Sequence, residues 1–341
     1  MRSVNDERGA IAVTVAFLMV ALIGFAALAI DIGALYQERQ TLQNGADAGA
    51  LAVAKDCAGG DCGSFTSTAR DYADANADDG RSNAAVCGNG PGLSPGCAPP
   101  RPLPTGALGH VQVTTSTYEV SSPDNPTEVN FNFAPVFDLV APGDHDGQTM
   151  RARAVAAWGP PRSATTLPLT FSRCEFEEHV PPLKTPPFNP AEEVVISFHG
   201  SPIAGDCLPS NSSGQRLPGG FGWLDPGGDC VVDATVGAFT PSEPGNDEPG
   251  CVDMDELRGT TVLLPIYDLE QGNGATGRYR IYGFAAFYLT GYRWQGRGFG
   301  GLCPGVGRSA TCIRGHFTSL TTTGPVFGGP DLGVNIVKLV G

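Results

Sequence analysis

The pattern of apolar and polar residues changes once, sharply, near the start of the chain. Residues 11–30 form an uncharged and mostly apolar run that contains no proline. As a helix this run would rise about 30 Å, the thickness of the hydrocarbon core of a bilayer. From Asp31 onward the sequence is amphipathic, and apolar residues recur on one helical face. These are Ile32, Leu35, Leu42, Ala46, Ala50 and Val53. The pattern predicts one long helix, with a transmembrane segment over residues 11–30 and a helical stalk over residues 31–56.

A cleaved signal peptide is the alternative for the apolar run. Arg2 and Arg8 would form its basic start, and residues 27–29 would offer a small-residue cleavage site. The apolar part of a signal peptide usually has about 7–15 residues, and turn-forming residues do not follow Asp31 here. A retained anchor is therefore favoured. The weak basic bias of residues 1–10 favours a cytoplasmic tip at the N-terminus and an extracytoplasmic ectodomain.

The rest of the chain is rich in turn formers and in short strand-like segments. The whole chain has 47 glycines and 29 prolines among its 341 residues, and their combined share is well above ordinary usage. Loop-like stretches are expected at 56–107, 121–128, 159–190 and 205–229, with a short helical piece at 67–77. Alternating or β-branched segments predict strands at 110–120, 128–139, 150–158, 194–199, 230–239, 260–268, 278–294 and 315–322.

These elements predict an α+β fold, in which a long N-terminal transmembrane and amphipathic helix precedes a disulfide-tied, β-rich ectodomain. A Pro-rich linker at 159–190 would separate a first ectodomain region, 57–158, from a second, 191–341. The aromatic residues of the second region are expected to form its core rather than a carbohydrate-stacking face, because aromatic side chains dominate small cores. They are Phe221, Trp223, Phe284, Phe287, Tyr288, Tyr292 and Trp294.

Every cysteine lies beyond the apolar run. The ten are Cys57, Cys62, Cys87, Cys97, Cys174, Cys207, Cys230, Cys251, Cys303 and Cys312. An even number on one side of a membrane indicates disulfides formed in an oxidising compartment. The close pairs 57–62, 87–97 and 303–312 are expected to close short loops, and the other four cysteines can pair in three ways. The histidines are scattered and no Cys-x-x-Cys occurs, so no metal or cofactor is expected.

The net charge of −14 offers no electrostatic footprint for nucleic acid. Two glycine-rich segments match G-x-G-x-x-G, but neither opens a helix as a dinucleotide site requires. A G-x-S-x-G nucleophile motif is absent. These patterns argue against a catalytic role.

Three motifs in the first 52 residues carry a family resemblance. Arg8 and Gly9 open the apolar run, and Asp31 and Gly33 close it. The stalk then contains a characteristic polar and small-residue run, which includes Leu42, Gln43, Asn44 and Asp47. In order and spacing this region resembles the N-terminal segment of the TadG-like proteins of tight-adherence (Flp) pilus systems. Gly45 and Gly49 replace two alanines usual in that family, and each is expected to loosen the helix by up to about 1 kcal/mol.

The sequence also differs from related pilins at positions that bear on function. Pilins processed by a prepilin peptidase carry a glutamate at the fifth mature position, which counted from Gly9 is Thr14 here. Cleavage and use as a major pilin subunit are therefore not expected. The Asp-x-Ser-x-Ser metal motif found in some TadG-like proteins is also missing.

The resemblance implies a non-enzymatic, single-pass component of Flp/Tad pilus assembly, acting as a minor pilin-like or scaffold part. Its partners would be the lipid bilayer and other pilus-assembly proteins or pilin-type helices. The small residues Gly24, Ala26, Ala27 and Ala29 would permit close helix packing in the membrane. Two alternatives are a membrane-tethered adhesin or wall-associated binding protein, and a secreted enzyme behind a cleaved signal peptide.

Overall fold

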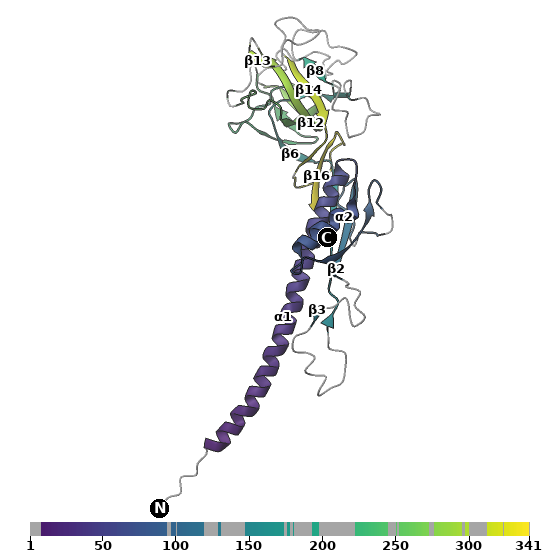
Figure 1. Ribbon diagram of the computed structural model, residues 1–341. Coiled ribbons are helices and arrows are strands. Elements are labelled where there is room, and N and C mark those ends of the chain that lie inside the picture. The colour runs from purple at the N-terminus through teal and green to yellow at the C-terminus, as the bar shows by residue number, and fades with distance from the viewer. Residues whose placement is uncertain are drawn as a thin grey trace, which may run out of the picture. The chain divides into compact units, whose positions relative to one another are not determined.

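The structure is a computed structural model, in which helices α1 and α2 come first and β-strands dominate the described residues that follow (Figure 1). It describes residues 8–93, 97–99, 101–118, 129–130, 147–173, 176–177, 180, 193–197, 222–244, 250, 252–272, 276–294, 297–299, 312–322 and 324–340. The chain divides into two compact units that alternate along the sequence. Unit 1 contains residues 1–52, 64–87 and 112–155, and unit 2 contains residues 53–63, 88–111 and 156–341.

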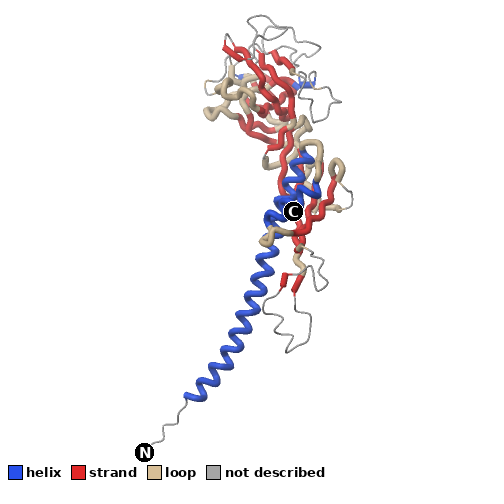
Figure 2. Tube along the Cα trace, viewed as in Figure 1, coloured by secondary structure: helices blue, strands red, loops and turns tan. Residues whose placement is uncertain are grey.

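Helix α1, Arg8–Ala58, runs without interruption for 51 residues (Figure 2). Apolar run and amphipathic segment thus form a single helix, as the pattern of hydrophobic residues predicts. The α+β class is confirmed as well, because β-strands make up the described elements that follow the second helix.

Unit 1 is built on the second half of α1. Helix α2, Phe65–Asn76, packs against it and corresponds to the short helical piece expected at 67–77. Strands β1, Ser82–Asn89, β2, Gly109–Thr117, and β5, Arg151–Gly159, are neighbours in that order. Two short strands, β3, Val129–Asn130, and β4, Gly147–Gln148, pair antiparallel.

Unit 2 contains a seven-stranded sheet. Its main path has the order β7-β11-β12-β14-β8, and β10 and β13 both pair with β12. The strands are β7, Phe171–Ser172; β8, Val194–Ser197; β10, Phe239–Pro241; β11, Thr261–Gln271; β12, Arg278–Trp294; β13, Arg297–Phe299; and β14, Cys312–Thr318. Strand β12 pairs antiparallel with both β11 and β14 and forms the centre of the sheet.

Both faces of this sheet are covered. Ala285 and Phe287 belong to one buried cluster, and their neighbours Phe284 and Ala286 belong to another. Because successive side chains of a strand point to opposite faces, β12 contributes to a core on each side. The aromatic residues Trp223, Phe284, Phe287 and Tyr292 are buried as predicted. Tyr288 is half-buried, while the side chains of Phe221 and Trp294 lie outside the description.

Smaller pairings complete unit 2. Strands β6, Ser163–Thr166, and β9, Val232–Thr235, pair antiparallel. Strand β16, Val334–Leu339, pairs with the end of β5 and, in parallel, with β15, Leu320–Thr322. The side-chain amide of Asn335 in β16 donates a hydrogen bond to the carbonyl of Ala58, 3.1 Å away. It satisfies one of the carbonyl groups that the last turn of a helix leaves unpaired.

Most expected strands are present, and several elements were missed. The expected segment 278–294 matches β12 in both bounds, whereas 230–239 is divided between β9 and β10 and 315–322 between β14 and β15. Helix α2 matches the short helical piece expected at 67–77. Strand β1 lies within the expected loop 56–107, and β6 and β7 lie within 159–190, so those loop expectations were wrong in part. Strand β16 was not expected at all. Most of the expected strand 128–139 lies outside the described residues.

Candidate functional site

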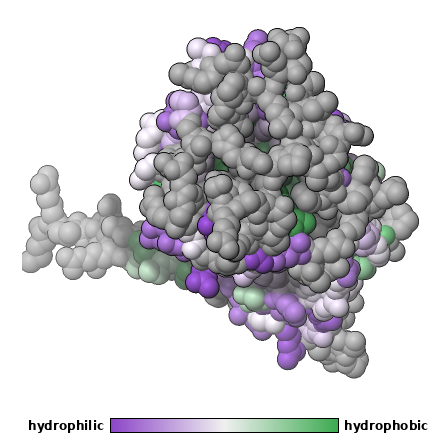
Figure 3. Space-filling view, turned by 90° about the horizontal axis from the view of Figure 1, so that it is seen from above, coloured by the Kyte–Doolittle hydropathy of each residue, from purple (hydrophilic) through white to green (hydrophobic). Residues whose placement is uncertain are grey.

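Helix α1 has two halves with opposite exposure. Its first half displays large apolar side chains to the surroundings, for example Phe17, which is 75% exposed. This exposed hydrophobic surface is seen in green beside the grey N-terminal residues in Figure 3. Within Ala12–Ala58 the helix is long and apolar enough to cross a membrane, and none of its most apolar 18-residue window is buried. The second half is different, because Leu42 is only 2% exposed.

The transition between the two halves occurs at Asp31. Its carboxylate-bearing side chain is 3% exposed, whereas Ile30 before it is 53% exposed and Ile32 after it 44%. Asp31 lies on the same helical face as Glu38, Leu42 and Gly49, because residues three, four and seven apart share a face of a helix. Burial of one face of α1 therefore begins one residue after the apolar run ends.

The two glycines of the stalk lie in a close contact between α1 and α2. A Cβ atom built on Gly45 would lie 3.0 Å from the Cα of Ala73, and one built on Gly49 would lie 3.2 Å from the carbonyl oxygen of Ala69. The pairs 45/73 and 49/69 run in opposite directions, so α1 and α2 are antiparallel. Gly45 and Gly49 allow the backbones of the two helices to approach closely. This packing role was not part of the sequence expectation, which concerned only their low helix propensity.

The motif residues of the stalk hold the rest of unit 1 in place. The Gln43 amide donates hydrogen bonds to Asp47 Oδ1, 2.8 Å away, and to the carbonyl of Arg153 in β5, 3.2 Å away. The hydroxyl of Thr115 in β2 donates to the carbonyl of Leu42. Asn44 accepts a hydrogen bond from Gln40 on the exposed side of the helix. These residues tie α1 to two strands of unit 1.

The four small residues expected to permit helix packing in the membrane contact little of the protein itself. Gly24 and Ala27 are half-exposed, and Ala26 and Ala29 are exposed. A Cβ atom on Gly24 or on Gly33 would meet no atom within 4 Å. Gly24 and Ala27 lie on the helical face that continues into Asp31 and the buried face of the stalk.

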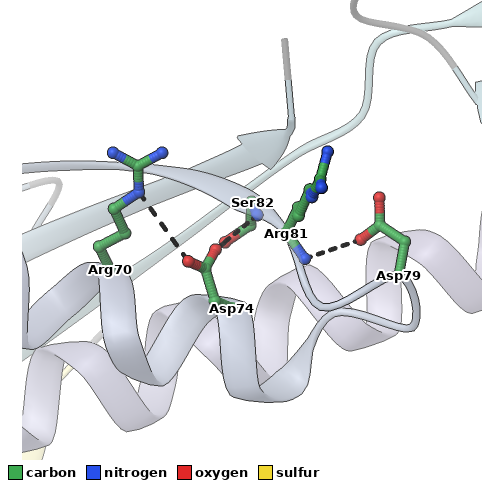
Figure 4. Close-up of polar contacts among 5 residues, drawn as sticks. All are labelled: Arg70, Asp74, Asp79, Arg81 and Ser82. Carbon is green, nitrogen blue, oxygen red and sulfur yellow. Dashed lines mark hydrogen bonds and ion pairs between the residues drawn. The ribbon is translucent and has the colours of Figure 1, made fainter. Parts of the chain in front are cut away.

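A polar cluster orders the turn between α2 and β1 (Figure 4). The backbone amide and hydroxyl of Ser82 both donate to Asp74 Oδ1, and Arg70 lies 3.9 Å from the other oxygen of that carboxylate. The amide of Arg81 donates to Asp79 Oδ1 at 2.9 Å. The guanidinium groups of Arg70 and Arg81 each lie 5.8 Å from the centre of the Tyr118 ring.

The same turn places two carboxylates near Glu38 of α1. Burial, together with the negative charges of Asp79 and Asp78, raises the pKa of Glu38 above its usual value. Asp78 itself accepts a hydrogen bond of 2.7 Å from the amide of Gln37. The contact between α1 and the α2–β1 turn thus combines one favourable hydrogen bond with a repulsion between like charges.

The described cysteines are all oxidised. Cys57, at the end of α1, forms a disulfide with Cys62, as expected from their spacing. Cys87, Cys97, Cys230 and Cys312 are also disulfide-bonded, and no free cysteine occurs in the described part of the chain. The other four, Cys174, Cys207, Cys251 and Cys303, lie outside the described residues, so the remaining expected pairings stay predictions.

The sequence interpretation missed the partner of the two stalk glycines. Ala69 and Ala73 have the same four-residue spacing as Gly45 and Gly49, and matching small-residue pairs permit close approach of two helices. This spacing was a usable signal. The short helical piece expected at 67–77 was not connected with the stalk, because nothing in its local pattern indicates a partner helix.

Comparison with known families agrees with this geometry. Residues 9–56 match the family model described as "Tad: Putative Flp pilus-assembly TadE/G-like". The match coincides with α1 and confirms the resemblance of this region to TadG-like proteins. No curated protein and no solved structure matches the chain. The TadE/G-like region supports a part for this protein in Flp pilus assembly, with a helix that anchors it in a membrane and contacts to other pilus proteins.

Proposed function

We propose that this protein is a non-enzymatic, single-pass component of Flp/Tad pilus assembly, with a cytoplasmic N-terminus and an extracytoplasmic ectodomain. The observation that carries the proposal is the continuity of α1. One helix joins an apolar half that exposes large apolar side chains to a half whose inner face is buried. The family match to residues 9–56 covers both halves.

In this proposal the two halves have different tasks. The apolar half lies in the bilayer and packs beside pilin-type helices through the face of Gly24 and Ala27, because small residues allow close contact where lipid gives no hydrophobic driving force. The stalk half carries unit 1 on a rigid support through Gly45 and Gly49. The protein thus acts as a minor pilin-like or scaffold part.

The test uses membranes from cells that produce the tagged protein with the other pilus components. After extraction with alkaline carbonate we expect the protein in the pellet, with residue 1 or 2 at its N-terminus, and other pilus components in the detergent pull-down. A mature chain beginning near Ile30 would contradict the retained anchor. A retained protein that brings down no pilus component would instead favour a membrane-tethered adhesin.

A further inference from the structure

The antiparallel packing of α1 and α2 determines which end of unit 1 faces the membrane. Gly45 contacts Ala73, and Gly49 contacts Ala69, so α2 descends toward the apolar half of α1 as its residue numbers increase. At its lower end, Asp78 accepts a hydrogen bond from Gln37. The C-terminal end of α2 is therefore the part of that helix nearest to the apolar run.

The height of this contact above the hydrocarbon core follows from the helix rise. Gln37 is seven residues beyond Ile30, which corresponds to about 10 Å along α1. Side chains of a helix lean toward its N-terminus, which places the bond to Asp78 somewhat lower. The polar layer of a bilayer adds about 5–8 Å on each side of the core. The end of α2 thus lies within a few ångströms of the headgroups.

The chain reverses direction at this level. The backbone amide of Ser82 donates to Oδ1 of Asp74, which lies one helical turn before Asp78. Residues 78–81 therefore form the part of the α2–β1 connection that lies farthest toward the apolar half of α1. Gly80 has a φ of +70°, and the Arg81 amide is bonded to Asp79, so this turn is ordered.

The residues around this turn are polar and exposed. Residues 78–81 are exposed and carry both signs of charge. Tyr36, six residues or about 9 Å beyond Ile30, is 72% exposed, and tyrosine is enriched at the level of lipid headgroups. The cationic group of residues 78–81 is the guanidinium of Arg81, which lies 5.8 Å from the centre of the Tyr118 ring.

We propose that the α2–β1 turn, residues 77–81, rests on the phospholipid headgroup layer of the leaflet from which α1 emerges. This inference depends on the proposed membrane anchor and adds a second contact to it. The turn then adds a contact with the bilayer surface to the one that the helix makes. The turn restricts the tilt of α1, which a single spanning helix leaves open.

The experiment is photo-crosslinking in phosphatidylcholine nanodiscs that hold the full-length protein. Benzoylphenylalanine replaces Asp79 in the test variant, Tyr36 in a calibrating variant and Thr66 in the control. Thr66 is exposed near the start of α2, twelve residues before Asp78 and about 18 Å farther from the bilayer along that helix. A fourth variant at Arg81 keeps the test valid should replacement of Asp79 disturb the turn.

We expect lipid adducts at positions 36 and 79, or 36 and 81, in yields several-fold above that at position 66. Adducts at position 36 alone, or equal yields at all positions, overturn the contact of the turn while leaving the anchor intact. Carbonate extraction of the same variants separates the two claims. Release of the protein into the supernatant overturns the anchor and the headgroup contact together.

Discussion

Gly45 of α1 lies so close to Ala73 of α2 that a Cβ atom added to the glycine would be 3.0 Å from the alanine Cα. The atom that such a Cβ would meet belongs to the backbone, which cannot move aside as easily as the end of a flexible side chain. The close approach of the two helices therefore depends on the absence of a side chain at position 45. Gly49 repeats the arrangement one turn later against Ala69. The substitution of glycine for the alanine usual at these positions thus coincides with a close helix-to-helix contact.

Replacement of Gly45 by leucine should destabilise unit 1. The added side chain cannot fit between α1 and α2, and overpacking of this kind typically costs about 1–3 kcal/mol. The free energy of unfolding, from urea titration followed by circular dichroism in detergent, measures the effect. Gly33→Leu is the matched control, because its Cβ meets nothing within 4 Å and loss of a helical glycine favours the helix. Equal stability of the two variants would contradict the contact.

Glu38→Gln should raise the stability of unit 1 at pH 7. Burial and the charges of Asp79 and Asp78 raise the pKa of Glu38, so the folded state binds the proton more tightly than the unfolded state. At pH values above the pKa of Glu38 in the folded state, its negative charge therefore lowers the free energy of unfolding. This loss disappears as the pH falls below the pKa of Glu38 in the unfolded state. Glutamine removes the charge at every pH.

The measurement for Glu38→Gln is the free energy of unfolding as a function of pH. The variant should exceed the wild type at pH 7 by less than about 1 kcal/mol, because the site is half-exposed and screened, and the two should converge near pH 4. Asp56→Asn, an exposed change on the same helix, serves as the control. A difference that grows toward low pH has the wrong sign and would refute the explanation.

Removal of the disulfide at the end of α1 should cost about 2 kcal/mol, because the bond closes a short loop in the unfolded chain. The variant replaces both Cys57 and Cys62 by serine, so that no free thiol remains to mispair. Thermal unfolding measures the loss. Peptide mapping without reduction should at the same time find all ten cysteines oxidised, and several free thiols would contradict that prediction.

Ala27→Leu should weaken helix association in the membrane without affecting insertion. Leucine keeps the segment apolar, so the membrane level of the protein should not change. It adds bulk on the face proposed to contact other helices, at a cost of about 1–2 kcal/mol of association free energy. Crosslinking to pilus components reports the effect, with Gly24→Leu as a second variant on the same face.

Phe25→Leu is the control for this pair, because Phe25 is a large exposed residue on another face of the helix. Unchanged crosslinking in both Ala27→Leu and Gly24→Leu would show that the apolar half is an anchor alone.

Local patterns were enough to determine α1 and the central strand of unit 2. The apolar run and the 3.6-residue period are properties of neighbouring residues, and they persist whatever packs around them. The same holds for β12, whose aromatic and β-branched residues predicted its bounds. The disulfide between Cys57 and Cys62 also follows from spacing.

Tertiary packing decided the features whose partners are distant in the sequence. The sequence indicated no packing partner for Gly45 and Gly49, and only the position of α2, with Ala69 and Ala73, shows what they contact. Strand β16 was missed, and its place in the sheet depends on pairing with β5, whose residues lie far away in the sequence, as well as with β15. A glycine or alanine has too little side chain to indicate its partner, so such contacts appear only when both chain segments are placed in space.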